Sequence, residues 1–252
     1  VAGAGGFIGS HLVEALVAEG HRVRAFVRYT GRQEIGSLRF LPEETLREIE
    51  IVQGDLRASD SVTRAVKGAQ WVFHLGALIS IPHSYLSPDE NFSTNVMGTL
   101  NVLQAARAAG VERVVHTSSS EVYGTARYVP MDELHPLQGQ SPYSASKIGA
   151  DKMAESFHCS FGLPVVTVRP FNVFGPRQST RAVIPTIITQ YLRGEKIHLG
   201  NLHPTRDFTF VEETVGAFLK AARASGVLGR EINVGSSREI PIGDLVSLVG
   251  RL

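Results

Sequence analysis

The chain has 252 residues, 43% of them hydrophobic and 19% charged, which suffices for one large globular domain or a domain that carries a smaller lobe. Its formal net charge of +1 and its lack of a dense Lys/Arg run argue against nucleic acid or a membrane surface as the main partner. The single cysteine, Cys159, cannot form an internal disulfide, the nine histidines lack the spacing of a zinc site, and no apolar stretch approaches about 18 residues. We therefore expect a cytoplasmic protein that uses no metal.

The chain opens with a glycine-rich turn. Gly3, Gly6 and Gly9 precede an apolar stripe in residues 10–19, and Gly20 ends the helix that this stripe predicts. Such glycines let the backbone approach a pyrophosphate, while the first helical turn offers free N–H groups and the positive end of its dipole. We expect a dinucleotide site here, and a tight turn without a ligand is the alternative. The predicted contacts are Gly3, Gly6, Phe7, Ile8 and Gly9.

Strands and helices alternate along the rest of the chain. Strands are predicted at residues 23–27, 51–53, 71–75, 113–117 and 165–168, and helices at 59–67, 95–109, 143–161, 184–193 and 212–224. This alternation predicts an α/β fold, a Rossmann-type doubly wound parallel sheet with helices on both faces. Prolines and glycines multiply from Arg169 onward. We therefore expect a dinucleotide-binding domain over residues 1–170 and a smaller, mainly substrate-binding lobe over 171–252, with segments that return to the first domain.

Both ends of the sequence carry an expectation of their own. Val1 enters directly at what should be the end of a strand, without an initiator methionine, and residues 244–252 stop inside a helix-like apolar pattern. We expect the first strand to be incomplete and further residues to follow Leu252.

The residues after the strand at 23–27 bear on how the cofactor's ribose is recognised. A carboxylate normally accepts the ribose hydroxyls of NAD there, but Val27 occupies the region, followed by Arg28 and Arg32. Because an arginine suits a 2′-phosphate, we predict NADP in preference to NAD, with a solvated strand-end charge as the alternative for Arg28. Asp55 either accepts the adenine amino group or caps the next turn. Further cofactor contacts are expected at Leu56, Leu75, Gly76, Ala77 and Pro170.

Tyr143 and Lys147 stand four residues apart in a predicted helix. This spacing puts both side chains on one face, so the Lys147 ammonium would favour the ionised form of the Tyr143 hydroxyl. A phenol whose ordinary pKa is about 10 would then be a usable base near neutrality. The pair alone is weak evidence, since an exposed amphipathic pair has the same spacing. The glycine turn and the serine-rich strand end at residues 117–121 make catalysis the better interpretation.

Taken together, these motifs resemble the extended short-chain dehydrogenase/reductases, specifically the nucleotide-sugar epimerase/dehydratase family. The matching elements cover essentially the whole chain and comprise Gly3-x-x-Gly6-x-x-Gly9, Asp55, His74-Leu-Gly-Ala77, Thr94-Asn-Val-Met-Gly98, Ser118 to Gly124, Tyr143-x-x-x-Lys147, Arg169-Pro-Phe-Asn172-Val-Phe-Gly-Pro176 and Arg206-Asp-Phe208. The resemblance implies a tightly bound NAD(P) that is recycled. Tyr143 would take the proton of the sugar C4 hydroxyl as hydride passes to the nicotinamide, and Ser119 would hydrogen-bond the same oxygen. Lys147 would bind the nicotinamide ribose and tune Tyr143.

Glu121 bears on the subclass that the resemblance implies. The 4-epimerases of the family have a small or hydroxylic residue at this place, whereas the 4,6-dehydratases carry Thr-Asp-Glu or Thr-Ser-Glu, and here the triplet is Ser119-Ser120-Glu121. Once C4 is a ketone the C5 proton is acidified, so one carboxylate can remove it and assist loss of the C6 hydroxyl as water. The implied catalytic residues are Ser119, Ser120, Glu121, Tyr143 and Lys147.

The implied activity is therefore that of a 4,6-dehydratase, and the nearest resemblance is to the enzymes of legionaminic-acid-type pathways. A 4-epimerase, a UDP-glucuronate decarboxylase and a catalytically idle NADP-binding sensor are the alternatives. The substrate would be a UDP- or GDP-linked hexose such as N-acetylglucosamine. Asn172 and Arg206 match positions that contact the nucleotide diphosphate, although a turn-forming asparagine and a surface ion pair with Asp207 fit the same residues.

The resemblance also implies a homodimer. In such enzymes the helices that match residues 95–109 and 143–161 pack as a four-helix bundle. The alanine-rich face of the first helix permits close approach, and it could equally lie against the sheet. The alanines are Ala105, Ala106, Ala108 and Ala109.

Overall fold

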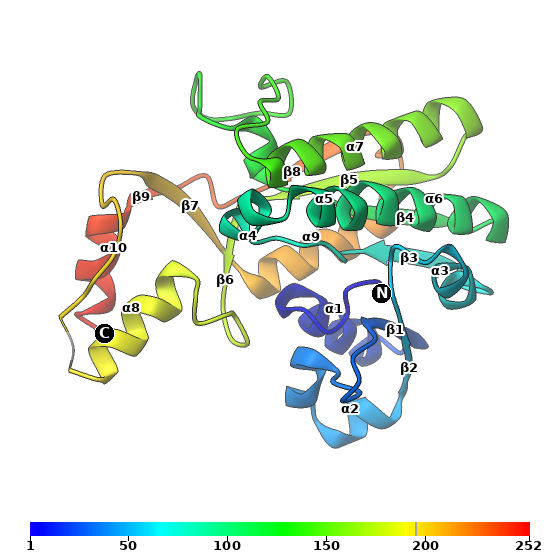
Figure 1. Cartoon of the computed structure of the whole chain (residues 1–252), viewed down its shortest axis with the longest axis horizontal. Helices are drawn as coiled ribbons and strands as arrows, with labels where there is room; N and C mark the ends of the chain where they lie inside the picture. The colour runs from blue at the N-terminus through cyan, green and yellow to red at the C-terminus, as the bar shows by residue number, and fades with distance from the viewer. Residues whose placement is uncertain (195) are drawn as a thin grey trace.

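A parallel sheet forms the centre of the protein (Figure 1), whose computed structural model describes residues 1–194 and 196–252. Its strands are β1 (Val23–Arg28), β2 (Ile49–Gly54), β3 (Trp71–His74), β4 (Arg113–Thr117), β5 (Val165–Pro170) and β8 (Glu231–Val234). β1 pairs with β2, and β3, β4, β5 and β8 follow one another in that order. Ala2 bridges Phe26 of β1 and His74 of β3, both in the parallel sense, so it joins the two groups.

Helices cover both faces of this sheet. They are α1 (Phe7–Ala18), α3 (Ser59–Val66), α6 (Gly98–Ala109), α7 (Pro142–Phe161) and α9 (Val211–Arg223). Apolar residues of α1 and α9, such as Leu12 and Phe218, share one buried cluster with the sheet. A second cluster joins α3, α6 and α7 through residues such as Val62, Leu103 and Phe157. The predicted doubly wound α/β fold is therefore confirmed.

The helix that carries Tyr143 and Lys147 begins at a strong start signal. Ser141 accepts the backbone N–H of Ser144, while the Ser144 hydroxyl accepts the backbone N–H of Ser141, which is a reciprocal capping box. Pro142 stands at the first helical position, where its missing N–H leaves no hydrogen bond unmade. The helix ends at Gly162, whose φ of 66° is left-handed. The local sequence thus determines where α7, the helix that carries the two candidate catalytic side chains, begins.

Several short elements connect the main ones and were not predicted. They are η1 (Gly36–Phe40), α2 (Glu43–Arg47), α4 (Ile81–Leu86), α5 (Pro88–Phe92), η2 (Ser93–Met97) and η3 (Ser120–Tyr123). η2 is a π-helical turn, a feature frequent at functional sites, and it replaces the regular helix expected from residue 95. In η2, Asn95 Oδ1 accepts the Leu78 N–H at 2.7 Å and so braces the chain that leaves β3.

Residues 171–252 divide between two places. The strands β6 (Asn172–Phe174), β7 (Thr205–Phe210) and β9 (Glu239–Pro241) form a small sheet beside the helices α8 (Val183–Leu192) and α10 (Ile242–Val249). Ile187, Ile242 and Leu245 form a separate buried cluster there. α8 and α10 lie side by side at the edge of the molecule opposite α3 (Figure 1), whereas β8 and α9 return to the main sheet. Among residues 1–194 and 196–252, no helix has the length and apolarity needed to cross a bilayer.

Candidate active site

The glycine turn is packed so closely that side chains do not fit. A Cβ on Gly3, whose φ is +81°, would lie 2.6 Å from the Gly76 nitrogen, and one on Gly9 would lie 2.2 Å from the Gly3 carbonyl oxygen. The Gly6 N–H donates to the Gly3 carbonyl at 3.0 Å, and Gly6 then caps α1 without a side chain. The first turn of α1 therefore presents its N–H groups where a pyrophosphate could approach. This cradle fits a dinucleotide.

A cleft of about 650 Å³ runs from the glycine turn to the candidate catalytic pair. Of the expected cofactor contacts, Arg32 is the one that does not line it. Those that do are Gly3, Gly6, Phe7, Ile8, Gly9, Arg28, Asp55, Leu56, Leu75, Gly76, Ala77, Tyr143, Lys147 and Pro170. Ser119 lines it as well, at the end nearest Tyr143. The structure thus gathers along one groove residues that lie up to 167 positions apart in the sequence, from Gly3 to Pro170.

Charged groups surround the far end of the cleft. Asp55 accepts the backbone N–H of Arg57 at 2.9 Å and its guanidinium at 2.6 Å, and this hydrogen bonding holds the pKa of Asp55 below its usual range. Asp55 therefore caps the turn that follows it, which is one of the two roles that the sequence suggested for this residue. Arg28 Nη2 lies 3.8 Å from Glu90 Oε1 and remains largely exposed. Thr30 and Glu34, which the sequence had not indicated, also line the cleft.

Tyr143 is buried at the other end. Burial raises the pKa of Tyr143 to about 12; a hydrogen bond with Ser119 lowers it, while the Glu121 and Asp151 carboxylates raise it. Burial thus opposes the ionised form of Tyr143 that the Tyr143–Lys147 spacing led us to expect, and Lys147 is not among the groups that shift this pKa. Tyr143 needs further positive charge in the loaded site before it can act as a base.

Lys147 is only 5% exposed, and its Nζ donates to the Thr117 carbonyl at 2.5 Å. Burial lowers the pKa of Lys147 to about 8, and the Asp151 carboxylate opposes that decrease. The Lys147 ammonium is thus hydrogen-bonded to the carboxyl end of β4, at a residue two positions before Ser119. The strand end and α7 are held together at the point where Ser119 meets Tyr143.

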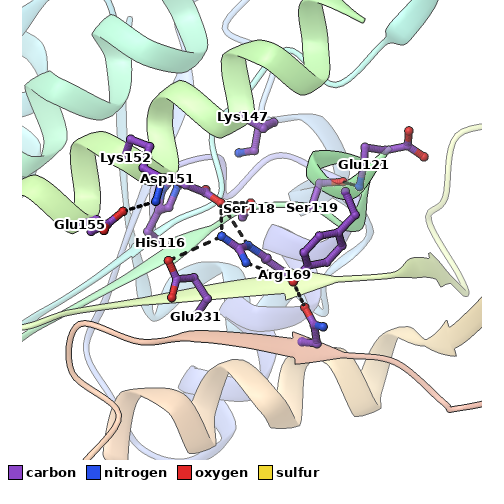
Figure 2. A network of polar contacts seen from close by, with 12 residues as sticks. His116, Ser118, Ser119, Glu121, Lys147, Asp151, Lys152, Glu155, Arg169 and Glu231 are labelled. Atoms are coloured by element: carbon purple, nitrogen blue, oxygen red, sulfur yellow. Dashed lines mark hydrogen bonds and ion pairs between the residues drawn. The ribbon is translucent and has the colours of Figure 1, made fainter. Parts of the chain in front are cut away.

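Glu121 lies in η3, whose first N–H groups are capped by Ser119; the Glu121 N–H donates to the Ser119 hydroxyl at 3.2 Å. Figure 2 shows the Glu121 carboxylate directed to the side opposite Asp151. Within the part of the chain that the structure describes, this carboxylate forms no hydrogen bond or ion pair. Neither Glu121 nor Ser120 lines the cofactor cleft. The negative charge of Glu121 nevertheless raises the pKa of Tyr143.

Asn172 and Arg206 are not brought to this cleft. Asn172 Nδ2 donates to the Asp207 carbonyl at 3.2 Å, and the exposed Arg206 donates to the Thr205 carbonyl at 2.8 Å. The Asp207 carboxylate accepts the backbone N–H groups of Ser236 and Ser237 at 2.8 and 2.9 Å. The surface ion pair considered for Arg206 is therefore replaced by a loop contact of Asp207.

The sequence of this chain is similar to those of known enzymes. Residues 1–249 match the family described as GDP-mannose 4,6 dehydratase. The chain is 35% identical to a UDP-glucose 4-epimerase of Mycolicibacterium smegmatis, with 97% of this chain and 79% of the relative covered. It is 33% identical to a dTDP-glucose 4,6-dehydratase of Streptomyces griseus, over 99% of this chain and 76% of the relative.

Solved structures give the same result. A UDP-N-acetylglucosamine 4-epimerase from Methanobrevibacter ruminantium superimposes with a TM-score of 0.91 at 32% identity, covering 99% of this chain and 80% of that one. DesIV, a dTDP-glucose 4,6-dehydratase from Streptomyces venezuelae solved as a double mutant with NAD bound, gives a TM-score of 0.87 at 29% identity, covering 98% and 78%.

The chain belongs to the extended short-chain dehydrogenase/reductase family of nucleotide-sugar epimerases and dehydratases. It is therefore an enzyme of the nucleotide-sugar dehydratase/epimerase type that uses NAD(P). Both dehydratases and epimerases stand among its relatives, so family membership alone does not choose between the two reactions.

Proposed function

We propose that the protein is a nucleotide-sugar 4,6-dehydratase that acts on a UDP- or GDP-linked hexose, with N-acetylglucosamine as the first sugar to test. The observation that carries this proposal is the Glu121 carboxylate, which lies in η3 two residues after Ser119, has no competing partner among the described residues, and acts electrostatically on Tyr143. An epimerase that inverts C4 alone has no use for such a group, whereas elimination across C5 and C6 requires one.

The proposed mechanism assigns one task to each side chain. Ser119 and Tyr143 hold the C4 hydroxyl, and Tyr143 takes its proton as C4 is oxidised. The glycine turn at Gly3, Gly6 and Gly9 would hold NAD(P), which when bound would supply the hydride exchange at C4 and C6 and positive charge that favours ionised Tyr143. Glu121 then removes the C5 proton and donates a proton to the departing C6 oxygen, so that one water leaves. As C6 is reduced, C5 takes up a proton from solvent and Tyr143 releases the proton that it took from the C4 hydroxyl. The result is a 4-keto-6-deoxy sugar on the same nucleotide.

A 4-epimerase is the second candidate function. In its favour, a UDP-glucose 4-epimerase is among the relatives, and Glu121 does not line the cleft that contains Ser119 and Tyr143. In that case Glu121 would be a carboxylate of η3 without a catalytic role, and the keto sugar would rotate in the site and be reduced on its other face.

A panel of UDP- and GDP-hexoses incubated with the enzyme distinguishes the two. Mass spectrometry would detect a product lighter by one water if the enzyme is a dehydratase. A 4-epimer of unchanged mass, identified by its NMR coupling constants, would assign the chain to the epimerases instead.

Cofactor choice forms a separate prediction. Arg28, with its side chain 63% exposed, and Arg57 both line the cleft beside the glycine turn, and a guanidinium there would pair with a 2′-phosphate. We expect NADP to bind at least about tenfold more tightly than NAD, which corresponds to about 1.4 kcal/mol. Calorimetric titration of the cofactor-free enzyme with each nucleotide measures this, and tighter binding of NAD would reverse the assignment and make Glu34 the ribose ligand to examine.

Assembly is proposed to be a homodimer through α6 and α7. The two helices contact each other, with the Arg107 guanidinium 3.9 Å from the Phe161 ring centroid, and Met97 and Phe161 expose apolar surface beside them. Ala105 and Ala106 are buried inside the chain, so only Ala108 and Ala109 remain available for a partner. Sedimentation equilibrium should give twice the chain mass, and a single monomeric species would contradict the proposal.

The two parts of the chain have separate proposed roles. Residues 171–252 would supply most of the substrate-binding lobe, where Asn172 and Arg206 would turn toward the nucleotide diphosphate once substrate is bound. Residues 1–170 would supply the dinucleotide-binding domain. Since the chain has a single cysteine, a reducing cytoplasm is the proposed location.

A further inference from the structure

A buried carboxylate lies behind the candidate catalytic pair. Asp151 follows Lys147 by four residues and Tyr143 by eight, so all three share one face of α7. Asp151 is 2% exposed, and among residues 1–194 and 196–252 it is the only acidic residue that is fully buried. A buried charge of this kind is costly unless it is paired and fully hydrogen-bonded.

Four hydrogen bonds satisfy this carboxylate (Figure 2). His116 Nε2 lies 3.1 Å from Oδ1, and the Ser118 hydroxyl donates to Oδ2 at 2.7 Å. Arg169, also buried, donates to Oδ2 through Nε at 3.2 Å and Nη2 at 3.1 Å. Both carboxylate oxygens are therefore occupied, and the group cannot turn toward solvent or substrate.

The same carboxylate links α7 to the end of β4. Three consecutive residues of β4 and its extension bond to α7, since His116 and Ser118 reach Asp151 while the Thr117 carbonyl accepts the Lys147 ammonium. The next residue along is Ser119, which lies against Tyr143. The distance between Ser119 and Tyr143 is thus set by this row of contacts.

Charge in this region is unevenly distributed. Lys147 and Arg169 are two buried cations, and Asp151 is the buried anion that faces both. Among the described residues, Asp151 is the charged neighbour that favours the ammonium form of Lys147, so removal of its charge would leave only the hydrogen bond to the Thr117 carbonyl. The other titratable groups around Lys147 and Asp151 are Tyr143 on α7, His74 on β3, His116 on β4, Arg169 on β5 and Glu121 in η3.

We propose that Asp151 is a positioning residue of the active site, which keeps Lys147 charged and holds it, together with the end of β4, in register with Tyr143. The inference rests on the proposed role of Tyr143 as the base. Asp151 itself touches neither substrate nor cofactor. Because activity requires the Lys147 ammonium, the alkaline limb of the kcat profile should follow the pKa of Lys147.

The variant D151N removes the charge and keeps the shape. We expect the alkaline limb of kcat to move to lower pH by about one unit or more, the size expected for loss of a neighbouring opposite charge. On that limb kcat then falls about tenfold at a fixed pH, since one pH unit is a factor of ten. D151E, which retains the charge on a longer side chain, should restore the wild-type limb.

E231Q is the matched control. Glu231 is the other carboxylate near Arg169, at 3.6 Å from Nη2, and it belongs to β8 rather than to the face that carries Lys147. The same change of carboxylate to carboxamide there should leave the pH profile unmoved. Equal shifts in D151N and E231Q, or none in D151N, would overturn the proposal.

Direct titration of Lys147 separates this inference from the proposed reaction. In enzyme with 15N-labelled lysine, the Nζ resonance should titrate near pH 8 in the wild type and lower in D151N, whether or not any sugar is turned over. If D151N does not fold, the wild-type titration still decides, because a Lys147 already neutral at pH 7 would refute the idea that Asp151 keeps it charged. A correct titration without nucleotide-sugar turnover would count against the proposed function alone.

Discussion

Replacement of Glu121 by glutamine is expected to abolish loss of water while leaving oxidation at C4 in place. Glutamine keeps the size of the side chain but cannot take the C5 proton, so kcat for the 4-keto-6-deoxy product should fall by about 10²- to 10⁴-fold, the usual contribution of a positioned acid or base. Wild-type enzyme in deuterated water should incorporate deuterium at C5, and E121Q should not. Mass spectrometry of the recovered nucleotide sugar measures both effects.

E155Q is the control for this variant. Glu155 stands on the exposed side of α7, where its carboxylate pairs with Lys152 at 2.5 Å, far from Tyr143 in the helix. The identical chemical change there should alter kcat by less than about twofold, because exposed ion pairs contribute little. If E121Q retained wild-type turnover with a product of unchanged mass, Glu121 would have no catalytic task and the epimerase interpretation would stand.

The sequence predicted the frame of this site well because the relevant signals are local. Glycine spacing predicted the turn before α1, and apolar runs of β-branched residues predicted β4 with the bounds that the structure has. Spacing alone placed Tyr143 and Lys147 on one face of a helix. In each case a pattern within about ten residues determines the backbone, so neighbouring elements need not be known.

Electrostatics could not be predicted in this way. The pKa of Tyr143 depends on how deeply α7 is buried, and that depth is set by β4, β5 and η3 rather than by the helix itself. Asp151 had a local signal, four residues beyond Lys147, but its role depends on His116 and Ser118, at the end of β4, and on Arg169 in β5. Glu34 reaches the cofactor cleft because η1 folds back on the glycine turn, where Ser37 N–H donates to the Gly5 carbonyl at 2.8 Å.

Replacement of Lys147 by methionine should separate stability from activity. Burial holds the pKa of Lys147 at about 8, against 10.5 in water, so the unfolded chain binds the proton more tightly than the folded one. This difference corresponds to about 3 kcal/mol of destabilisation below pH 8. The lost hydrogen bond to the Thr117 carbonyl offsets about 2 kcal/mol of the gain. K147M is therefore expected to unfold at pH 7 with about 1 kcal/mol more free energy than wild type, while kcat falls by about 10²- to 10⁴-fold.

The difference in the free energy of unfolding between K147M and wild type should depend on pH. Wild-type stability gains from the Lys147 term as pH rises from about 8 toward 10.5, because the folded state releases the proton first. Tyr143 acts in the opposite direction only above its unfolded pKa of about 10, so measurements up to pH 9.5 isolate the lysine. Urea unfolding at pH 7 and 9.5 should show the advantage of K147M, about 1 kcal/mol at pH 7, reversed to a deficit of about 1 kcal/mol at pH 9.5, because wild type gains about 2 kcal/mol over that interval. K152M, a change at an exposed lysine of the same helix, should differ from wild type by less than about 0.5 kcal/mol at both pH values. An advantage of K147M that stayed constant with pH would mean that Lys147 is not buried as a charged group, and the electrostatic account of the site would have to be replaced by one based on packing.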